Sequence, residues 1–174
     1  MKRWLLLTLA LVSAPALADW QFTRWGMSPD EVVAASQGQV QRVKDKKDLR
    51  VRDLPRLAIG QVKEGDVAFD MEFFFKDQKL SFIRYNPIKS MTCSGEEQFF
   101  LDRFGPAEAT ETTDEIRDKH LVLMKTRDRF WKLENGDQLK YETIWFERPD
   151  LQGVKTEPMC IALLEPLPSA TAPR

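Results

Sequence analysis

The feature that most constrains this chain is a strict alternation of large apolar residues in one short segment. Val67, Phe69, Met71, Phe73 and Phe75 occupy every second position. Successive side chains of a β-strand point to opposite faces, so all five lie on one face of a predicted strand. A stripe of phenylalanine and methionine at this spacing is typical of a buried core face. The segment therefore needs other elements of the chain to cover it.

Strand signals flank this stripe on both sides. Residues 76–79 form a polar turn of hairpin length, and residues 80–85 return as the next strand. Residues 57–62 precede another polar turn and add a third strand. We predict an antiparallel meander with one heavily apolar face, and we expect the helix that precedes it in sequence to cover that face.

That first helix has a well-defined start and stop. Ser28 is a predicted N-cap, Pro29 suits the first helical position, and Glu31 completes a capping box with Ser28. Gly38 supplies a C-terminal stop. The pattern predicts a helix over about residues 29–37.

A second helix is predicted to begin at Ser94, where Ser94 and Glu97 repeat the capping-box spacing, and to end at Gly105 and Pro106. More strand signals follow it, with an Asn135-Gly136 hairpin turn among them. The predicted strand segments are 121–126, 130–133, 138–147 and 159–164, after a polar stretch over 107–119 that reads as loop or frayed strand.

The order of elements predicts an α+β fold made of two helix-plus-antiparallel-meander units in one domain. The interval between the two helix starts, Ser28 and Ser94, nearly equals the interval between the two stops, Gly38 and Gly105. This spacing is compatible with a tandem duplication, although it rests on pattern and not on sequence identity.

The predicted domain spans residues 19–165, with candidate subunits over 19–88 and 89–165. Residues 166–174 are rich in proline and small residues, and we expect a disordered tail there.

The first residues, Met1–Ala18, have the pattern of a secretory signal peptide. Lys2 and Arg3 precede an apolar run that is too short to span a bilayer, and an A-x-A site ends at Ala18. We therefore expect export to the periplasm with cleavage after Ala18. The residue directly after the cleavage point is Asp19 and not a cysteine, and no second long apolar run occurs, so neither a lipoprotein anchor nor a transmembrane segment is expected.

Two further compositional features bear on function. The whole chain has a net charge of −1, and removal of the leader takes away two more positive charges, which argues against nucleic acid as a partner. The two cysteines, Cys93 and Cys160, predict one disulfide in an exported protein, with a reactive thiol as the alternative.

Little in the sequence points to catalysis, and we expect neither an enzyme nor a bound cofactor or metal. His120 is the only histidine, no G-x-S-x-G or phosphate-binding motif occurs, and a zinc site lacks ligands. One enzymatic alternative remains: Asp70 and Glu72 share a strand face and could act in carboxylate-dependent hydrolysis.

Binding is the favoured class of function. Trp131, Tyr141 and Trp145 are candidate partner-binding residues, since aromatic residues often dominate interfaces. The alternative is that they fill the core, and exposure of at least two of them distinguishes binding from packing. Residues 39–56 interleave basic and acidic side chains. They indicate a solvated loop or edge strand, or a docking surface for anionic headgroups or an acidic partner.

The run from Trp25 to Val32 resembles the G-M-[ST]-x-x-x-V helix opening of small Gram-negative envelope proteins, including outer-membrane assembly lipoproteins of the SmpA/OmlA type. The resemblance extends in element order to the architecture of β-lactamase inhibitor protein. The second helix opening lacks the motif and there is no lipobox cysteine, so the resemblance implies a small periplasmic binding protein rather than a lipoprotein. Its partner would be an unidentified protein or envelope component. An inhibitor of a hydrolase is the alternative that the resemblance implies.

Overall fold

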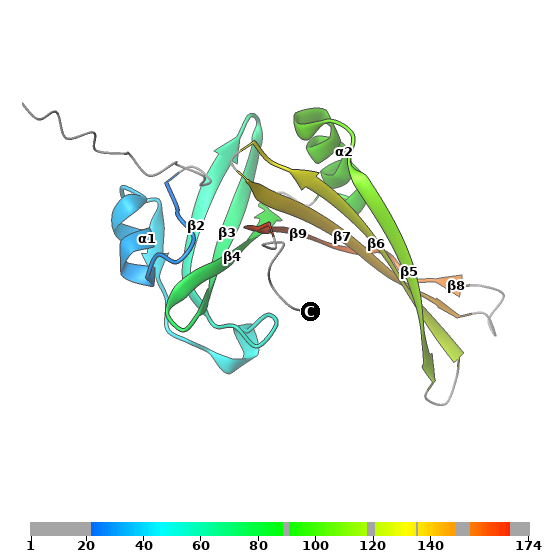
Figure 1. The fold of residues 1–174 in the computed structure, drawn as a ribbon. Helices are drawn as coiled ribbons and strands as arrows, with labels where there is room; N and C mark the ends of the chain where they lie inside the picture. The colour runs from blue at the N-terminus through cyan, green and yellow to red at the C-terminus, as the bar shows by residue number, and fades with distance from the viewer. Residues whose placement is uncertain (1–21, 89–90, 118–120, 135, 149–153, 168–174) are drawn as a thin grey trace, which may run out of the picture.

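The computed structural model describes residues 22–88, 91–117, 121–134, 136–148 and 154–167. These residues form one continuous antiparallel sheet with the order β1-β2-β3-β4-β9-β7-β6-β5, and β8 pairs with β7 (Figure 1). The strands are β1 Val40–Arg42, β2 Arg56–Glu64, β3 Val67–Lys76, β4 Lys79–Pro87, β5 Glu108–Arg117, β6 Leu121–Lys132, β7 Asp137–Arg148, β8 Val154–Lys155 and β9 Met159–Pro166.

The prediction of two separate helix-plus-meander units is wrong. The two meanders, β2–β4 and β5–β7, do exist, but β9 lies between them and pairs with both. It pairs with β4 from Ile83 to Tyr85 and with β7 from Asp137 to Ile144. Because one strand completes both meanders, their sheets merge into one and the candidate subunits share a single sheet.

The helices are short. They are α1 Pro29–Ala35, the 3₁₀ turn η1 Lys47–Leu49, and α2 Cys93–Phe104. The capping box of α1 is confirmed: Ser28 Oγ accepts from the Glu31 amide at 3.3 Å, and a Glu31 carboxylate oxygen accepts from the Ser28 amide at 2.7 Å. The predicted stop of α2 is also confirmed, because Gly105 there has a φ of 79° and donates to the Leu101 carbonyl.

The core lies between the sheet and α2. Phe99 and Phe100 of α2 reach strands on both sides of β9: the Phe99 ring is 5.3 Å from the Phe69 ring of β3, and the Phe100 ring is 5.7 Å from the Tyr141 ring of β7. The helix α1 packs beside β1 and β2 at one edge, contributing mainly Val32 (Figure 1). The expected cover of the first meander is thus only partly provided by α1, because seven residues present too little apolar surface; α2 provides the rest.

The opposite face of the sheet carries a smaller apolar cluster. The Phe74 and Phe82 rings stack at 4.5 Å beside Leu163, and the turn that carries Val51 and Leu54 packs over them. The predicted stripe in β3 is therefore correct, and Phe74 on the opposite face of this strand is buried as well.

The strands β5, β6 and β7 continue beyond α2, so one part of the α2-facing surface of the sheet has no helix over it (Figure 1). The predicted loop or frayed strand over 107–119 is mostly the regular edge strand β5. The residues directly before α1 form a turn, in which Trp25 Nε1 donates to Asp137 Oδ1 at 2.5 Å.

Candidate functional site

The three candidate partner-binding residues all point to the α2-facing side of the sheet, but they differ in exposure. Trp131 is 3% exposed and Tyr141 is 1% exposed, whereas Trp145 is partly exposed. Trp131 Nε1 donates to the Gly105 carbonyl at 2.8 Å, and the Tyr141 hydroxyl donates to the Cys93 carbonyl at 2.7 Å. Trp131 and Tyr141 therefore hold the two ends of α2 against the sheet, as core residues do. Only Trp145 is placed to contact a partner, so the expected exposure of at least two of the three is not met.

Trp145 lies in a recess of about 280 Å³ on the uncovered part of the sheet, beside the N-terminal end of α2. Strands β6, β7 and β8 and the segment that leads into β9 form it. The lining residues are Arg127, Thr143, Trp145, Lys155, Thr156 and Pro158.

Two polar atoms in the wall of this recess are buried without a partner. Thr143 is 5% exposed, and among the described residues neither its Oγ1 nor Arg127 Nε has a hydrogen-bond partner. Buried polar groups are normally hydrogen-bonded, and leaving one unpaired costs about 1–3 kcal/mol. A bound group with an oxygen acceptor would satisfy these donors.

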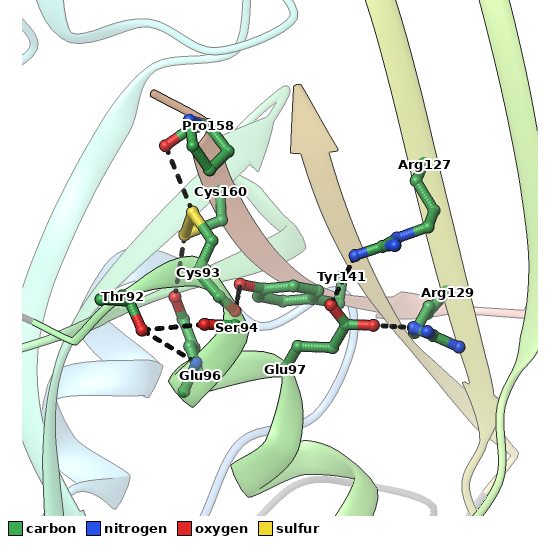
Figure 2. Close-up of polar contacts among 11 residues, drawn as sticks. Thr92, Cys93, Ser94, Glu96, Glu97, Arg127, Arg129, Tyr141, Pro158 and Cys160 are labelled. Carbon is green, nitrogen blue, oxygen red and sulfur yellow. Dashed lines mark hydrogen bonds and ion pairs between the residues drawn. A yellow bond between two sulfur atoms is a disulfide. The ribbon is translucent and has the colours of Figure 1, made fainter. Parts of the chain in front are cut away.

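Another donor of Arg127 is used inside the protein. Glu97 of α2 is buried and accepts from Arg127 Nη2 at 2.7 Å and from Arg129 Nε with its second oxygen (Figure 2). The predicted capping box of Ser94 with Glu97 is therefore wrong. Thr92 is the N-cap, its hydroxyl accepting from the Gly95 amide at 3.1 Å, so Glu97 faces the sheet instead of the helix start.

The predicted disulfide is confirmed. Cys93 and Cys160 are bonded, with their Cα atoms 5.6 Å apart. The bond joins the first residue of α2 to β9, and Cys160 pairs in register with Thr143 of the recess. The disulfide and the recess are thus neighbours on the same side of the sheet.

A buried carboxyl group lies against this disulfide. Glu96 is 2% exposed, and its Oε2 is 3.3 Å from Cys160 Sγ (Figure 2). A disulfide sulfur carries no hydrogen, so this contact is a hydrogen bond only when Glu96 is protonated and donates. Glu96 Oε1 has no partner among the described residues.

Burial raises the pKa of Glu96 to about 7, and the nearby Tyr141 hydroxyl opposes only part of this shift. The tyrosine is affected in turn, since its own burial and the charge of Glu96 both raise the pKa of Tyr141. A carboxyl that holds its proton near neutral pH is one that can donate or accept it.

The carboxylate pair considered for hydrolysis lies on the other face of the sheet, in a polar hollow of about 610 Å³. Burial alone would raise the pKa of Glu72, but hydrogen bonds and charge from Arg56 and Arg84 outweigh it and lower the pKa. Asp70 is exposed and accepts from Gln61 Nε2 at 2.9 Å. Glu72 is therefore held as an ion pair and not as a proton donor.

Three further predictions from the sequence concern His120, the leader and the charged segment over 39–56. His120 and Met1–Ala18 lie outside the described residues. Within the charged segment over 39–56, Arg50 pairs with Asp45, and Arg52 pairs with Glu165 at 2.8 Å. These pairings reduce the field that an anionic surface would meet, and the docking alternative stays a prediction.

Among the residues that the structure places, no group of three His, Cys, Asp or Glu side chains could hold a metal ion. None of the helices in this part of the chain is long and apolar enough to cross a membrane.

The sequence matches no family model, no curated protein and no solved structure. The resemblance to envelope assembly lipoproteins and to the inhibitor architecture stays a prediction.

Sequence reasoning missed Arg127, Thr143 and Glu96. No local signal marks them: Arg127 lies in an alternating charged strand, and Glu96 lies in a polar run at the start of a helix. Their proximity depends on α2 crossing β6 and β7, which is a long-range feature of the fold.

Proposed function

We propose that this chain is an exported binding protein, and that it binds a protein or an envelope component through the recess beside α2, with no catalysis at that recess. The observation that carries the proposal is the pair of buried, unpartnered donors, Thr143 Oγ1 and Arg127 Nε, next to the partly exposed Trp145. The signal-peptide pattern of Met1–Ala18 supports export to the periplasm.

The chemistry of the walls defines what would fit. Arg127 and Thr143 offer donors at the base, and the exposed Lys155 adds a positive charge at the rim. The Trp145 ring offers an apolar surface for stacking or aliphatic contact. The matching group carries an oxygen acceptor, such as a carboxylate, a phosphate or a backbone carbonyl, attached to an apolar portion.

The recess also has the rigidity that a binding site needs. Glu97 fixes Arg127 from α2, and the Phe146 amide donates to Thr156 Oγ1 at 3.0 Å, which holds the segment after β8 against β7. A site whose side chains are already held loses less conformational entropy on binding.

The test is capture from an envelope extract by the mature, oxidised protein, followed by titration of the purified partner. Trp145→Ala and Thr143→Val remove the apolar wall and the unpartnered hydroxyl, and Lys79→Ala in the distant β3–β4 turn is the matched control. We expect the wild type and the control to bind the same partner equally, and Trp145→Ala to weaken binding at least about tenfold, as for an interface hot spot.

Two outcomes would count against the proposal. A partner that both recess variants bind as well as the wild type places the site elsewhere. The absence of any saturable partner for the wild type removes binding as the function. Circular dichroism of each variant checks that it is folded.

A further inference from the structure

The Cys93–Cys160 disulfide has two unlike ends. Cys93 is the first residue of the 12-residue helix α2, and its sulfur is 3.4 Å from the carbonyl oxygen of the exposed Pro158 (Figure 2). The positive end of a helix dipole stabilises a thiolate and lowers the pKa of a cysteine placed there. Cys93 is therefore the sulfur that lies beside exposed backbone and the one best suited to carry negative charge.

The other sulfur faces the protein interior. Cys160 Sγ contacts Glu96 Oε2 at 3.3 Å, the Tyr141 hydroxyl is the other polar group near this carboxyl, and Glu96 Oε1 has no hydrogen-bond partner among the described residues. Its neighbour Glu97 is a contrast, because two arginines neutralise it there. Glu96 is thus a buried carboxyl without a cation, aimed at a disulfide sulfur.

We propose that the Cys93–Cys160 disulfide is redox-active, exchanging with the thiols of a dithiol partner, and that Glu96 is the catalytic acid and base for Cys160. This activity does not depend on what binds in the recess. It requires only a thiol-bearing molecule that reaches Cys93.

The exchange begins when a partner thiolate attacks Cys93 Sγ. The bond between the two cysteine sulfurs breaks, its electron pair goes to Cys160 Sγ, and that sulfur takes the proton of Glu96 Oε2. The products are a mixed disulfide between the partner and Cys93, the Cys160 thiol, and the Glu96 carboxylate.

The partner's second thiol completes the reaction. It loses its proton to solvent and attacks the partner's own sulfur in the mixed disulfide, so Cys93 leaves as the thiolate that the α2 dipole favours. The partner is oxidised to a disulfide, and this chain is reduced by two electrons. In the reverse direction the Glu96 carboxylate removes the proton from Cys160.

The titratable and charged groups around Glu96 come from three elements. They are Tyr141 of β7, Arg127 of β6, and Glu97 of α2 itself. Since Arg127 is already paired with Glu97, no cation is paired with Glu96 among these groups. Glu96 is therefore free to exchange a proton near neutral pH.

The test measures reduction of the oxidised, mature, native protein by dithiothreitol at pH 6, 7 and 8, with thiols trapped by alkylation and counted by mass. Rates are expressed per dithiothreitol thiolate. We expect the wild-type rate to decline with a midpoint near pH 7, as Glu96 loses its proton. Glu96→Gln should be slower by at least about tenfold at pH 6, the low side of what a positioned proton donor contributes, and should show no such decline. Asp102→Asn, on the exposed side of the same helix, should behave like the wild type.

A second measurement does not depend on the Glu96 variant folding. In Cys160→Ser, the remaining Cys93 should form a mixed disulfide with oxidised glutathione and titrate below the ordinary cysteine pKa of about 8.5. In Cys93→Ser, the remaining Cys160 should do neither. A native disulfide that dithiothreitol reduces only in denaturant, a wild-type rate per thiolate that is constant across this pH range, or equal reactivity of the two single cysteines would each overturn the proposal.

Discussion

Replacing Glu96 with glutamine should stabilise the oxidised protein at pH 8 and do so much less at pH 5. The reason is that the folded protein buries this carboxyl at 2% exposure without a cation, so folding favours the neutral form. Glutamine has nearly the same shape and is neutral at every pH. The variant therefore removes a penalty that the wild type has only when Glu96 must ionise.

The magnitude follows from the pKa of Glu96, which burial raises from 4.5 to about 7. Between these values the unfolded chain has released a proton that the folded chain still holds, so the free energy of unfolding falls as the pH rises. Each pKa unit corresponds to about 1.4 kcal/mol, which makes the full penalty about 3 kcal/mol above pH 7. Below pH 4.5 both states are protonated and the penalty disappears.

The assay is denaturant unfolding of the wild type and Glu96→Gln, followed by tryptophan fluorescence at pH 5, 6, 7 and 8 with the disulfide intact. The difference in unfolding free energy should grow from about 1 kcal/mol at pH 5 to about 3 kcal/mol at pH 8. Asp102→Asn should show no such trend. A difference that is the same at every pH, or a variant that is less stable at pH 8, would refute the placement of Glu96 as a buried carboxyl without a cation.

Three further substitutions probe the contacts that hold the fold. Glu72→Gln should destabilise the protein by about 2 kcal/mol at pH 7, since water screens the partly exposed arginines beside it; because the pKa of Glu72 is lowered, the loss should vanish as the pH falls well below 4.5, and an equal loss at pH 3 would contradict the ion-pair assignment. Trp131→Phe removes the hydrogen bond to the Gly105 carbonyl and should lower the unfolding free energy by about 1 kcal/mol; an unchanged melting temperature would show that this bond contributes nothing. Replacing both Cys93 and Cys160 with alanine opens the loop that their disulfide closes and should reduce stability by about 4 kcal/mol in denaturant titrations, and a loss below about 1 kcal/mol would contradict the chain-entropy argument.

Local signals predicted the elements well. The capping box of Ser28, the stop at Gly105 and the alternation in β3 each depend on a few neighbouring residues whose side chains interact directly with the adjacent backbone or share one strand face. The disulfide followed from two cysteines and an export signal. Such features need no knowledge of the rest of the fold.

The long-range arrangement was not accessible in the same way. The sequence of residues 159–166 contains no signal that they pair with both β4 and β7. This pairing converts the two predicted units into one sheet. The function of Glu97 was misjudged for a related reason. The spacing of Glu97 from Ser94 fits a cap. However, Arg127 and Arg129, which bind Glu97, lie about thirty residues away on β6 and are stronger partners than a helix amide.

The position of β9 also determines how this chain must be assembled. Among the described strands β9 comes last in the sequence, yet it lies in the interior of the sheet, between β7 and the much earlier strand β4. Until it docks, β4 and β7 each present an unpaired edge, and such edges pair readily with other chains. Pairings between distant segments form slowly, so the interval before β9 inserts is the period in which a refolding chain is most exposed to aggregation. The yield of refolding should therefore fall as protein concentration rises. Truncation within β9 should leave two separate half-sheets with unpaired, aggregation-prone edges instead of a slightly shorter protein.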